Sequence, residues 1–285
     1  MGISKVAAIN DLSGFGKCSL TAALPILAAM GVQACPLPTA ALSSQTAFPD
    51  FVCVDLSGHF DAFSRQWRGM NPVFQGIYSG FLFNEQQVAQ VEQFLDLFAD
   101  NHATVVVDPV FGDEGHYYPI FHDGMRDALL HLIRRADLIT PNLTEACLLT
   151  GRSYGQVAEA ENPLDPAQEI ARTLAALGPG QVVITGIHLP GAQIATLGYV
   201  ADQDRAFVVQ NRRVGSGYYS GTGDIMASIL CGSLLRGDTL EQGVRLAAAL
   251  LEQAITKSYQ DGTDPREGIA FEPYLPLLLP RGEKQ

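Results

Sequence analysis

Ser220-Gly-Thr-Gly-Asp224 is the stretch of sequence that decides how the rest is interpreted. It closes a glycine-rich run that starts at Val214, and the apolar segment 225–235 after it is predicted to be a buried helix that ends near Gly237. A glycine-rich turn at a helix N-terminus leaves backbone N–H groups unpaired, and the helix dipole adds positive potential, so an anion site is predicted. Asp224 either only caps this helix or accepts a proton from a hydroxyl that attacks a phosphoryl group.

The composition excludes several classes of protein. The chain has 285 residues, of which 47% are hydrophobic and 17% charged, enough for one large α/β domain or two ordinary ones. A net charge of −12 argues against a nucleic-acid partner. We expect no membrane span, because no apolar run approaches about 18 residues. Five scattered cysteines without a C-x-x-C pair, and a start without a signal-peptide pattern, predict a cytoplasmic protein.

Strands and helices are expected to alternate along the chain. The predicted strands cover residues 6–9, 34–38, 76–81, 105–107, 138–140 and 181–185, and the predicted helices cover 19–30, 85–98, 124–135, 167–177 and 240–257. An antiparallel pair is expected at 196–201 and 206–213, a loop or flap at 39–48, irregular structure at 50–75, and a tail at 271–280 that packs on the surface. No linker or repeat divides the chain. The predicted fold is therefore one α/β domain over residues 1–285, with a central, mostly parallel sheet and helices on both faces.

Polar residues follow several of these strands at their C-terminal ends, where open α/β sheets bind ligands. Asp11 and Ser13 follow the first strand, Asp108 follows strand 105–107, and Asn142 and Glu145 follow strand 138–140. Local roles are open alternatives, since Asp11 suits a turn cap and Glu145 suits the first turn of a helix. We nevertheless expect Asp108, Asn142 and Glu145 to converge at one site. An aspartate at the end of a core strand suits a metal-linked carboxylate.

Together these motifs resemble the ribokinase-type small-molecule kinases, and among them the pyridoxal kinases, over essentially the whole chain. The most specific piece is Gly221-Thr-Gly-Asp224 at the start of a helix. Three segments add to it in the expected order: Asp108-Pro-Val with Gly112-Asp113, Thr140-Pro-Asn142 with Glu145, and Val183-Ile-Thr-Gly186. Two more resemble substrate-side segments of pyridoxal kinases, namely Ser43-Ser-Gln-Thr46 and Gly80-Phe81.

The resemblance implies a ribokinase-like fold and ATP-dependent phosphorylation of the 5′-hydroxymethyl group of pyridoxal, pyridoxine or pyridoxamine. It implies that Asp224 is the general base and that the N–H groups of Gly221, Thr222 and Gly223 hold the developing phosphoryl charge. Residues implied at the ATP site are Asp108, Asp113, Asn142, Thr185, Gly186 and Thr222, with Asp108 and Glu145 organising Mg²⁺. Residues implied at the acceptor site are Asp11, Ser13, Ser44, Thr46, Phe81 and Asp224, covered by residues 39–48. A homodimer is implied, and a requirement for a monovalent cation such as K⁺ is left open.

Three departures from the pyridoxal-kinase pattern leave the preferred acceptor open. Asp11 stands where many of these enzymes have serine, Ser44-Gln45 replaces Asn-His, and Phe81 lacks a tyrosine hydroxyl. A hydroxymethylpyrimidine kinase of the same fold is the main alternative. A sugar or nucleoside kinase is disfavoured because the early Gly-Gly motif is not evident. A non-catalytic nucleotide or vitamer sensor is disfavoured because a pure binder gains nothing from Asp224 beside a phosphate.

Overall fold

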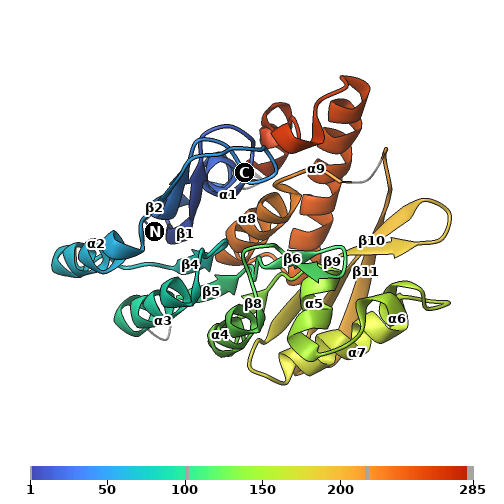
Figure 1. Ribbon diagram of the computed structural model, residues 1–285, viewed down its shortest axis with the longest axis horizontal. Helices are drawn as coiled ribbons and strands as arrows, with labels where there is room; N and C mark the ends of the chain where they lie inside the picture. The colour runs from blue at the N-terminus through green and yellow to red at the C-terminus, as the bar shows by residue number, and fades with distance from the viewer. Residues whose placement is uncertain (1, 100–102, 216–217, 281–285) are drawn as a thin grey trace, which may run out of the picture.

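A nine-stranded sheet organises the computed structural model, which describes residues 2–99, 103–215 and 218–280 (Figure 1). The strand order is β11-β10-β9-β8-β5-β4-β1-β2-β3, and the pairs from β2 to β9 are parallel. Antiparallel strands flank this block, with β3 at one edge and β10 and β11 at the other. The strands are β1 Lys5–Ser13, β2 Gln33–Leu42, β3 Cys53–Asp55, β4 Gly76–Ser79, β5 Thr104–Val107, β8 Leu138–Ile139, β9 Gln181–Leu189, β10 Gln193–Val200 and β11 Arg205–Arg212.

Helices cover both faces of this sheet and create two buried apolar cores. One core joins the sheet to α1, α8 and α9, and the other joins its opposite face to α2, α3, α4, α5 and α7 (Figure 1). The helices are α1 Ser19–Ala29, α2 Ser57–Met70, α3 Glu85–Phe98, α4 Asp123–Ile133, α5 Leu143–Thr150, α6 Tyr154–Ala158, α7 Leu164–Ala175, α8 Thr222–Leu235 and α9 Leu240–Gln260. The predicted α/β fold with a mostly parallel, doubly covered sheet is confirmed.

Helix α8 is buried on all sides along most of its length because it lies between the sheet and two other helices. Its residues from Ile225 to Ser233 are buried, and it packs on α1, α9, β4 and β5. This burial holds the N-terminal turn of α8 beside the C-terminal ends of β4 and β5, which places the predicted anion site at the predicted edge of the sheet. The C-terminal tail contains the 3₁₀ helix η3 Glu272–Leu278, which packs on α1 and α9, as expected of a tail on the surface.

Two sequence predictions about residues 39–75 are wrong. The expected loop 39–48 begins later, because β2 continues to Leu42 despite Pro36 and Pro38. Strand β3 pairs only with residues 40–42 of β2. Among the described residues, no strand pairs with β2 on that side beside Pro36 and Pro38, so the N–H groups that these prolines lack are not required there.

Residues 50–75 are also more regular than predicted, since they contain β3 and α2. Helix α2 buries only Ser57, Phe60 and Ser64, which is too sparse an apolar stripe to predict from the sequence. Smaller differences are the helix α6 and a hairpin of β6 Gly112–Asp113 with β7 His116–Tyr117. Within the described ranges, no helix is both long and apolar enough to cross a membrane.

Candidate active site

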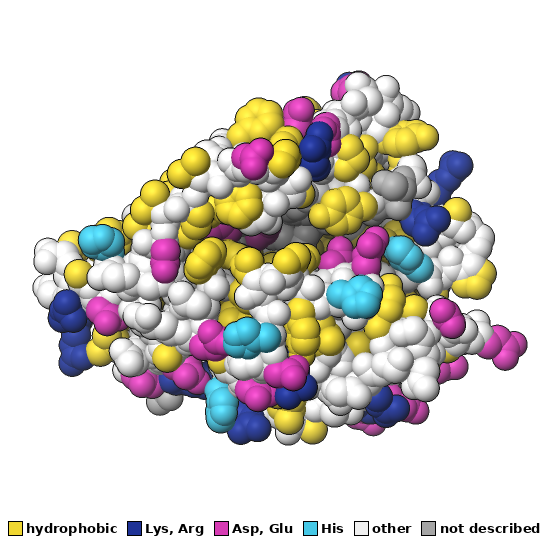
Figure 2. Space-filling view, viewed as in Figure 1, with side chains coloured by type: hydrophobic (Ala, Val, Ile, Leu, Met, Phe, Trp, Pro, Cys, Tyr) yellow, Lys and Arg dark blue, Asp and Glu magenta, His cyan; other side chains and the backbone are white. Residues whose placement is uncertain are grey.

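A cavity of about 350 Å³ lies between the C-terminal edge of the parallel strands and the start of α8. Figure 2 shows this face of the molecule hollowed across its middle, with acidic side chains in and beside the hollow. The lining includes every residue predicted for phosphoryl transfer, ATP and metal: Asp108, Asp113, Asn142, Glu145, Thr185, Gly186, Gly221, Thr222, Gly223 and Asp224. The structure therefore brings these residues to one place, and among them are Asp108, Asn142 and Glu145, which the strand-end argument predicted to converge.

The glycine-rich turn before α8 has a backbone that only glycine adopts without strain. Gly221 is the N-cap of α8 with a left-handed φ of 80°, and a Cβ on it would lie 2.0 Å from the carbonyl oxygen of Lys17. The N–H of Ser220 donates to the carbonyl of Pro265 at 3.0 Å, which fixes the turn from its other side. The first N–H groups of α8 follow this turn directly. They form the positive end of the helix dipole, which lies at the cavity. Ser216 and Gly217, in the predicted glycine-rich run, lie outside the described residues.

Asp224 is the third residue of α8, and the N-cap is Gly221, so Asp224 is not the N-cap residue of this helix. Oδ1 of Asp224 accepts a hydrogen bond of 3.0 Å from Nδ2 of Asn10. Burial, with a smaller effect of the negative charge of Asp11, raises the pKa of the Asp224 carboxyl to about 6, against the hydrogen bonds from Ser19 and Asn10. A carboxylate with this pKa is ionised at neutral pH and still basic enough to accept a proton.

Asp108 lies beside the glycine turn, at the C-terminal end of β5. Its Oδ1 accepts a hydrogen bond of 2.8 Å from the hydroxyl of Thr140, and its Oδ2 lies 3.9 Å from the place of a Cβ on Gly223. Burial and the negative charge of Asp224 raise the pKa of the Asp108 carboxyl to about 7. The carboxylates of Asp108 and Asp224 are thus held close together in a buried environment of low dielectric constant.

Glu145 and Asn142 form a capping box at the start of α5. Asn142 accepts from the N–H of Glu145, and Glu145 accepts from the N–H of Asn142, both at 2.8 Å. Glu145 also accepts from the N–H of Phe111 at 3.1 Å, and Asn142 donates to the carbonyl of Gly112 at 2.8 Å. Burial, then the charge of Asp108, raises the pKa of Glu145 well above its usual value. This pair therefore holds the loop after Asp108 in place at the cavity wall.

The chemistry of these side chains fits a hard divalent cation. Asp108 and Glu145 supply oxygen ligands of the kind that Mg²⁺ prefers. Burial, and after it the charge of a neighbouring carboxylate, raises the pKa of both groups, and a bound cation would favour their ionised forms. No group of three or more His, Cys, Asp and Glu side chains in residues 2–99, 103–215 and 218–280 is arranged to hold a metal ion. Magnesium usually keeps waters and substrate phosphates as its other ligands, so two protein carboxylates suffice.

The predicted acceptor residues lie outside the lining of this cavity, apart from Asp224. Asp11 is 4% exposed, and its Oδ2 accepts a hydrogen bond of 2.7 Å from Ser13. Burial raises the pKa of the Asp11 carboxyl, against hydrogen bonds from Ser19 and Ser13. The ring of Phe81 is half-buried and packs against Phe121 at a centroid distance of 5.8 Å.

The segment of Ser44 and Thr46 is held by a residue that was not predicted as functional. The buried side chain of Gln45 donates to the carbonyl of Arg266 at 2.8 Å and accepts from the N–H of Ala47 at 2.8 Å. Ser44 is half-buried and Thr46 exposed. Their role at the acceptor site stays a prediction.

Other residues at the site were missed by the sequence analysis. Asn10 contacts Asp224, and its one sequence signal is an amide directly after the apolar run Val6–Ile9. The lining also includes Tyr118, Tyr154, His188, Asn211, Arg212, Arg213, Glu252 and Ile255. The two arginines follow one another at the end of the predicted strand 206–213, and a basic pair beside an anion site was the available signal. The rest come from distant segments and gave no local signal.

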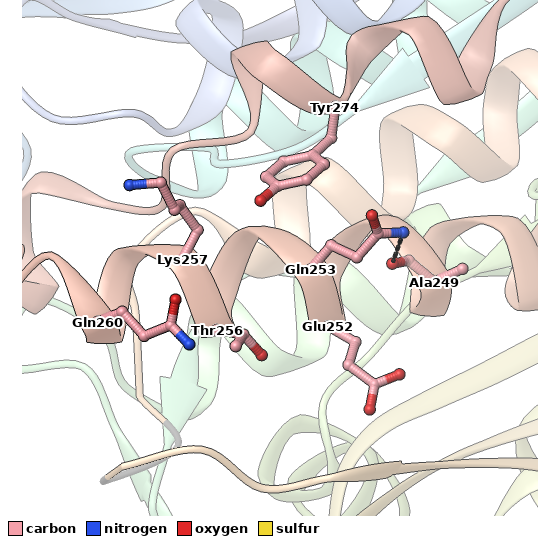
Figure 3. Close-up of a pocket in the computed structure, with 7 residues that line it drawn as sticks. All are labelled: Ala249, Glu252, Gln253, Thr256, Lys257, Gln260 and Tyr274. Carbon is pink, nitrogen blue, oxygen red and sulfur yellow. Dashed lines mark hydrogen bonds between the residues drawn. The ribbon is translucent and has the colours of Figure 1, made fainter.

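A second hollow lies on the exposed side of α9 and is lined by Ala249, Glu252, Gln253, Thr256, Lys257, Gln260 and Tyr274 (Figure 3). Gln253 donates back to the carbonyl of Ala249, and Lys257 pairs with Asp261. None of the predicted site residues lines it. The cavity at the start of α8 is therefore the candidate active site.

Comparisons with known proteins find similar chains among kinases of small heteroaromatic molecules. The family model described as Phosphomethylpyrimidine kinase matches residues 69–267. A pyridoxine/pyridoxal/pyridoxamine kinase of Bordetella avium is 29% identical over 88% of this chain and 84% of its own. A phosphomethylpyrimidine kinase structure from Bacteroides thetaiotaomicron, in a crystal form with pyridoxal, is 35% identical with a TM-score of 0.92 over 99% of this chain and 98% of its own. Pyridoxal kinase of Leishmania donovani with ADP and pyridoxamine shares the fold, at 23% identity and a TM-score of 0.82 over 96% and 95%.

Proposed function

The chain belongs to the phosphomethylpyrimidine kinase family, and from that premise we propose that it transfers the γ-phosphoryl group of ATP to the 5′-hydroxymethyl group of a vitamin B6 vitamer. The observation that carries the proposal is the single cavity that holds a glycine-rich helix start, Asp224 and Asp108 together. The Bordetella avium kinase acts on B6 vitamers by its name, and the Bacteroides thetaiotaomicron structure contains pyridoxal. The Leishmania donovani enzyme holds ADP, which supports ATP as the donor. We propose that residues 1–285 act as one catalytic domain.

In the proposed reaction Asp224 accepts the proton of the attacking hydroxyl. A pKa of about 6 leaves this carboxylate ionised at neutral pH. The N–H groups of Gly221, Thr222 and Gly223 stabilise the negative charge that develops on the transferred phosphoryl group. Their positions are fixed before the substrate arrives, because Gly221 is packed against Lys17 and Ser220 is bonded to Pro265.

The remaining cavity residues are proposed to hold the nucleotide. Asp108 and Glu145 would hold Mg²⁺, which when bound neutralises charge on the ATP phosphates. Asp113, Asn142, Thr185 and Gly186 line the same cavity and are proposed to contact ATP. The acceptor is proposed to lie toward Asp11, Ser13, Ser44, Thr46 and Phe81, beyond Asp224.

A hydroxymethylpyrimidine kinase is the second candidate, because the matching family model carries a pyrimidine kinase description. Both acceptors present a hydroxymethyl group on a heteroaromatic ring, so the cavity and Asp224 serve either reaction. The departures at Asp11, Gln45 and Phe81 lie on the acceptor side, where the two activities differ.

The test is a coupled ADP-release assay with Mg-ATP and, separately, pyridoxal, pyridoxine, pyridoxamine and hydroxymethylpyrimidine. Asp224→Asn is expected to lower kcat about 100-fold or more, the scale of a lost general base. Asp165→Asn, at an exposed aspartate in the first turn of α7, is the matched carboxylate-to-amide control and should keep kcat within about threefold. Turnover of hydroxymethylpyrimidine alone would select the second candidate. Nucleotide binding without turnover of any acceptor would instead indicate a sensor.

The proposed homodimer is separate from the chemistry. It predicts a mass near twice 30.6 kDa in light scattering coupled to size-exclusion chromatography. A monomer at enzyme concentrations that give full turnover would contradict it.

A further inference from the structure

Asn10 joins the proposed general base to the proposed acceptor site. It lies in β1, is fully buried, and donates a hydrogen bond from Nδ2 to Oδ1 of Asp224 at 3.0 Å. Its Oδ1 accepts from the N–H of Asp11 at 2.9 Å and from the N–H of Phe81 at 2.8 Å. One amide thus contacts the proposed base and two segments of the proposed acceptor site.

The orientation of this amide is determined by its partners. Two backbone N–H groups require an oxygen, so the nitrogen of Asn10 must face the carboxylate of Asp224. Gly80 makes this arrangement possible, since a Cβ at that position would lie 2.2 Å from Nδ2 of Asn10. An amide with three hydrogen bonds in a filled space has little freedom to rotate. The carboxylate that it contacts is therefore held in one orientation.

We propose that Asn10 is a positioning residue for phosphoryl transfer, which fixes the Asp224 carboxylate relative to the acceptor segments at Asp11 and Phe81. The inference rests on the proposed role of Asp224 as general base. A base in the correct rotamer before the acceptor binds does not have to be ordered during the reaction, and small displacements of a catalytic group reduce rate strongly. Asn10 itself need not touch the acceptor.

Asn10→Asp is the most selective change. It keeps an oxygen for the N–H groups of Asp11 and Phe81, and it replaces only the donor that faces Asp224. At pH 8 we expect kcat to fall about 10-fold or more, because a charged hydrogen bond becomes a contact between carboxylates, while the KM for ATP changes less than about twofold. Gln87→Glu is the matched control, a fully buried amide that accepts from Phe83 and donates to Thr39 and Asp55. It is expected to leave kcat within about twofold.

A double-mutant cycle separates positioning from a structural role. If Asn10 acts through Asp224, Asn10→Asp should cost kcat little in an Asp224→Asn background, where the base is already absent. Equal losses in both backgrounds, or an unchanged kcat in the single variant, would overturn the proposal. Asn10→Ser, whose hydroxyl is too short to replace the amide, is put through the same cycle if Asn10→Asp does not fold.

Thermal unfolding gives a readout that does not depend on activity. Asn10→Asp should lower Tm at pH 8 in the wild-type background and lower it much less with Asp224→Asn, where an amide again faces a carboxylate. A wild-type chain that phosphorylates none of the four acceptors would refute the proposed function while this Tm cycle still reports the Asn10–Asp224 contact. Tm losses that are the same in both backgrounds would refute the contact itself.

Discussion

The phosphate side and the acceptor side of the candidate site differ in how well the sequence predicted them. On the phosphate side, all ten predicted residues line one cavity. On the acceptor side, five predicted residues come from three segments, and none of these five lines that cavity. Phosphate recognition depends on backbone geometry at a helix start and at strand ends, which short motifs encode. Acceptor recognition depends on side chains whose neighbours come from distant segments, such as Gln45 against Arg266.

The largest expected effect tests the phosphate side through its backbone. Gly221→Ala should lower kcat about 100- to 1,000-fold with every acceptor, because the new Cβ meets the Lys17 carbonyl at 2.0 Å and the turn that presents the N–H groups must move. Steady-state kinetics with pyridoxal and hydroxymethylpyrimidine measure it. A loss confined to one acceptor would contradict this prediction. It would mean that the glycine turn takes part in acceptor recognition, and the distinction between the two sides would not hold.

Gly237→Ala is the control for backbone strain. Gly237 follows the other end of α8 with a φ of 82°, and no described atom lies within 4 Å of the place of its Cβ. We expect a stability loss of about 1 kcal/mol from the left-handed φ, measured by thermal unfolding, and kcat within about twofold of the wild type. A similar kcat loss in both variants would mean that strain in α8, and not the anion turn, lowers the rate.

The sequence was sufficient where local pattern and global topology agree. Val105-Val-Val107 predicted a buried central strand, so the sequence alone placed Asp108 at the sheet edge. The capping roles of Asn142 and Glu145 can also be predicted from the sequence, because their spacing suits a capping box. Helix α2 was missed because it buries few apolar residues, and Asn10 was missed because its partners, Phe81 and Asp224, lie 71 and 214 residues away.

The next prediction concerns the free energy of unfolding, and its expected effect is of intermediate size. It tests the buried charge of Asp224 on the phosphate side. The folded pKa of Asp224, about 6, lies above that of an unfolded aspartate, so the folded chain holds a proton that the unfolded chain releases near pH 4. This group therefore favours folding below pH 4 and loses that contribution as pH rises through about 6. Asp224→Asn should raise the free energy of unfolding at pH 8 by up to about 3 kcal/mol.

The gain should disappear at pH 4, where the wild-type carboxyl is protonated in the folded chain. Denaturant unfolding at the two pH values measures the difference, and the exposed pair partner Asp261→Asn serves as a control with little change at either pH. A gain of equal size at both pH values would show that Asp224 is not a strained buried charge. The raised pKa of Asp224 would then no longer indicate that burial adapts this carboxylate to its proposed role on the phosphate side.

The smallest expected effect tests the acceptor side. Phe81→Tyr adds a hydroxyl to a half-buried ring that packs against Phe121, and its backbone N–H is bonded to Asn10. If this ring faces the acceptor, kcat/KM for pyridoxal relative to hydroxymethylpyrimidine should change about three- to tenfold, the scale of one hydrogen bond, with the KM for ATP unchanged. Phe83→Tyr is the control, since the ring centroid of Phe83 lies 6.4 Å from that of Phe81. It should leave the ratio unchanged. A uniform change across all acceptors would place Phe81 in the scaffold around Asp224, and acceptor selection would then rest on Asp11 and the segment of Ser44 and Thr46.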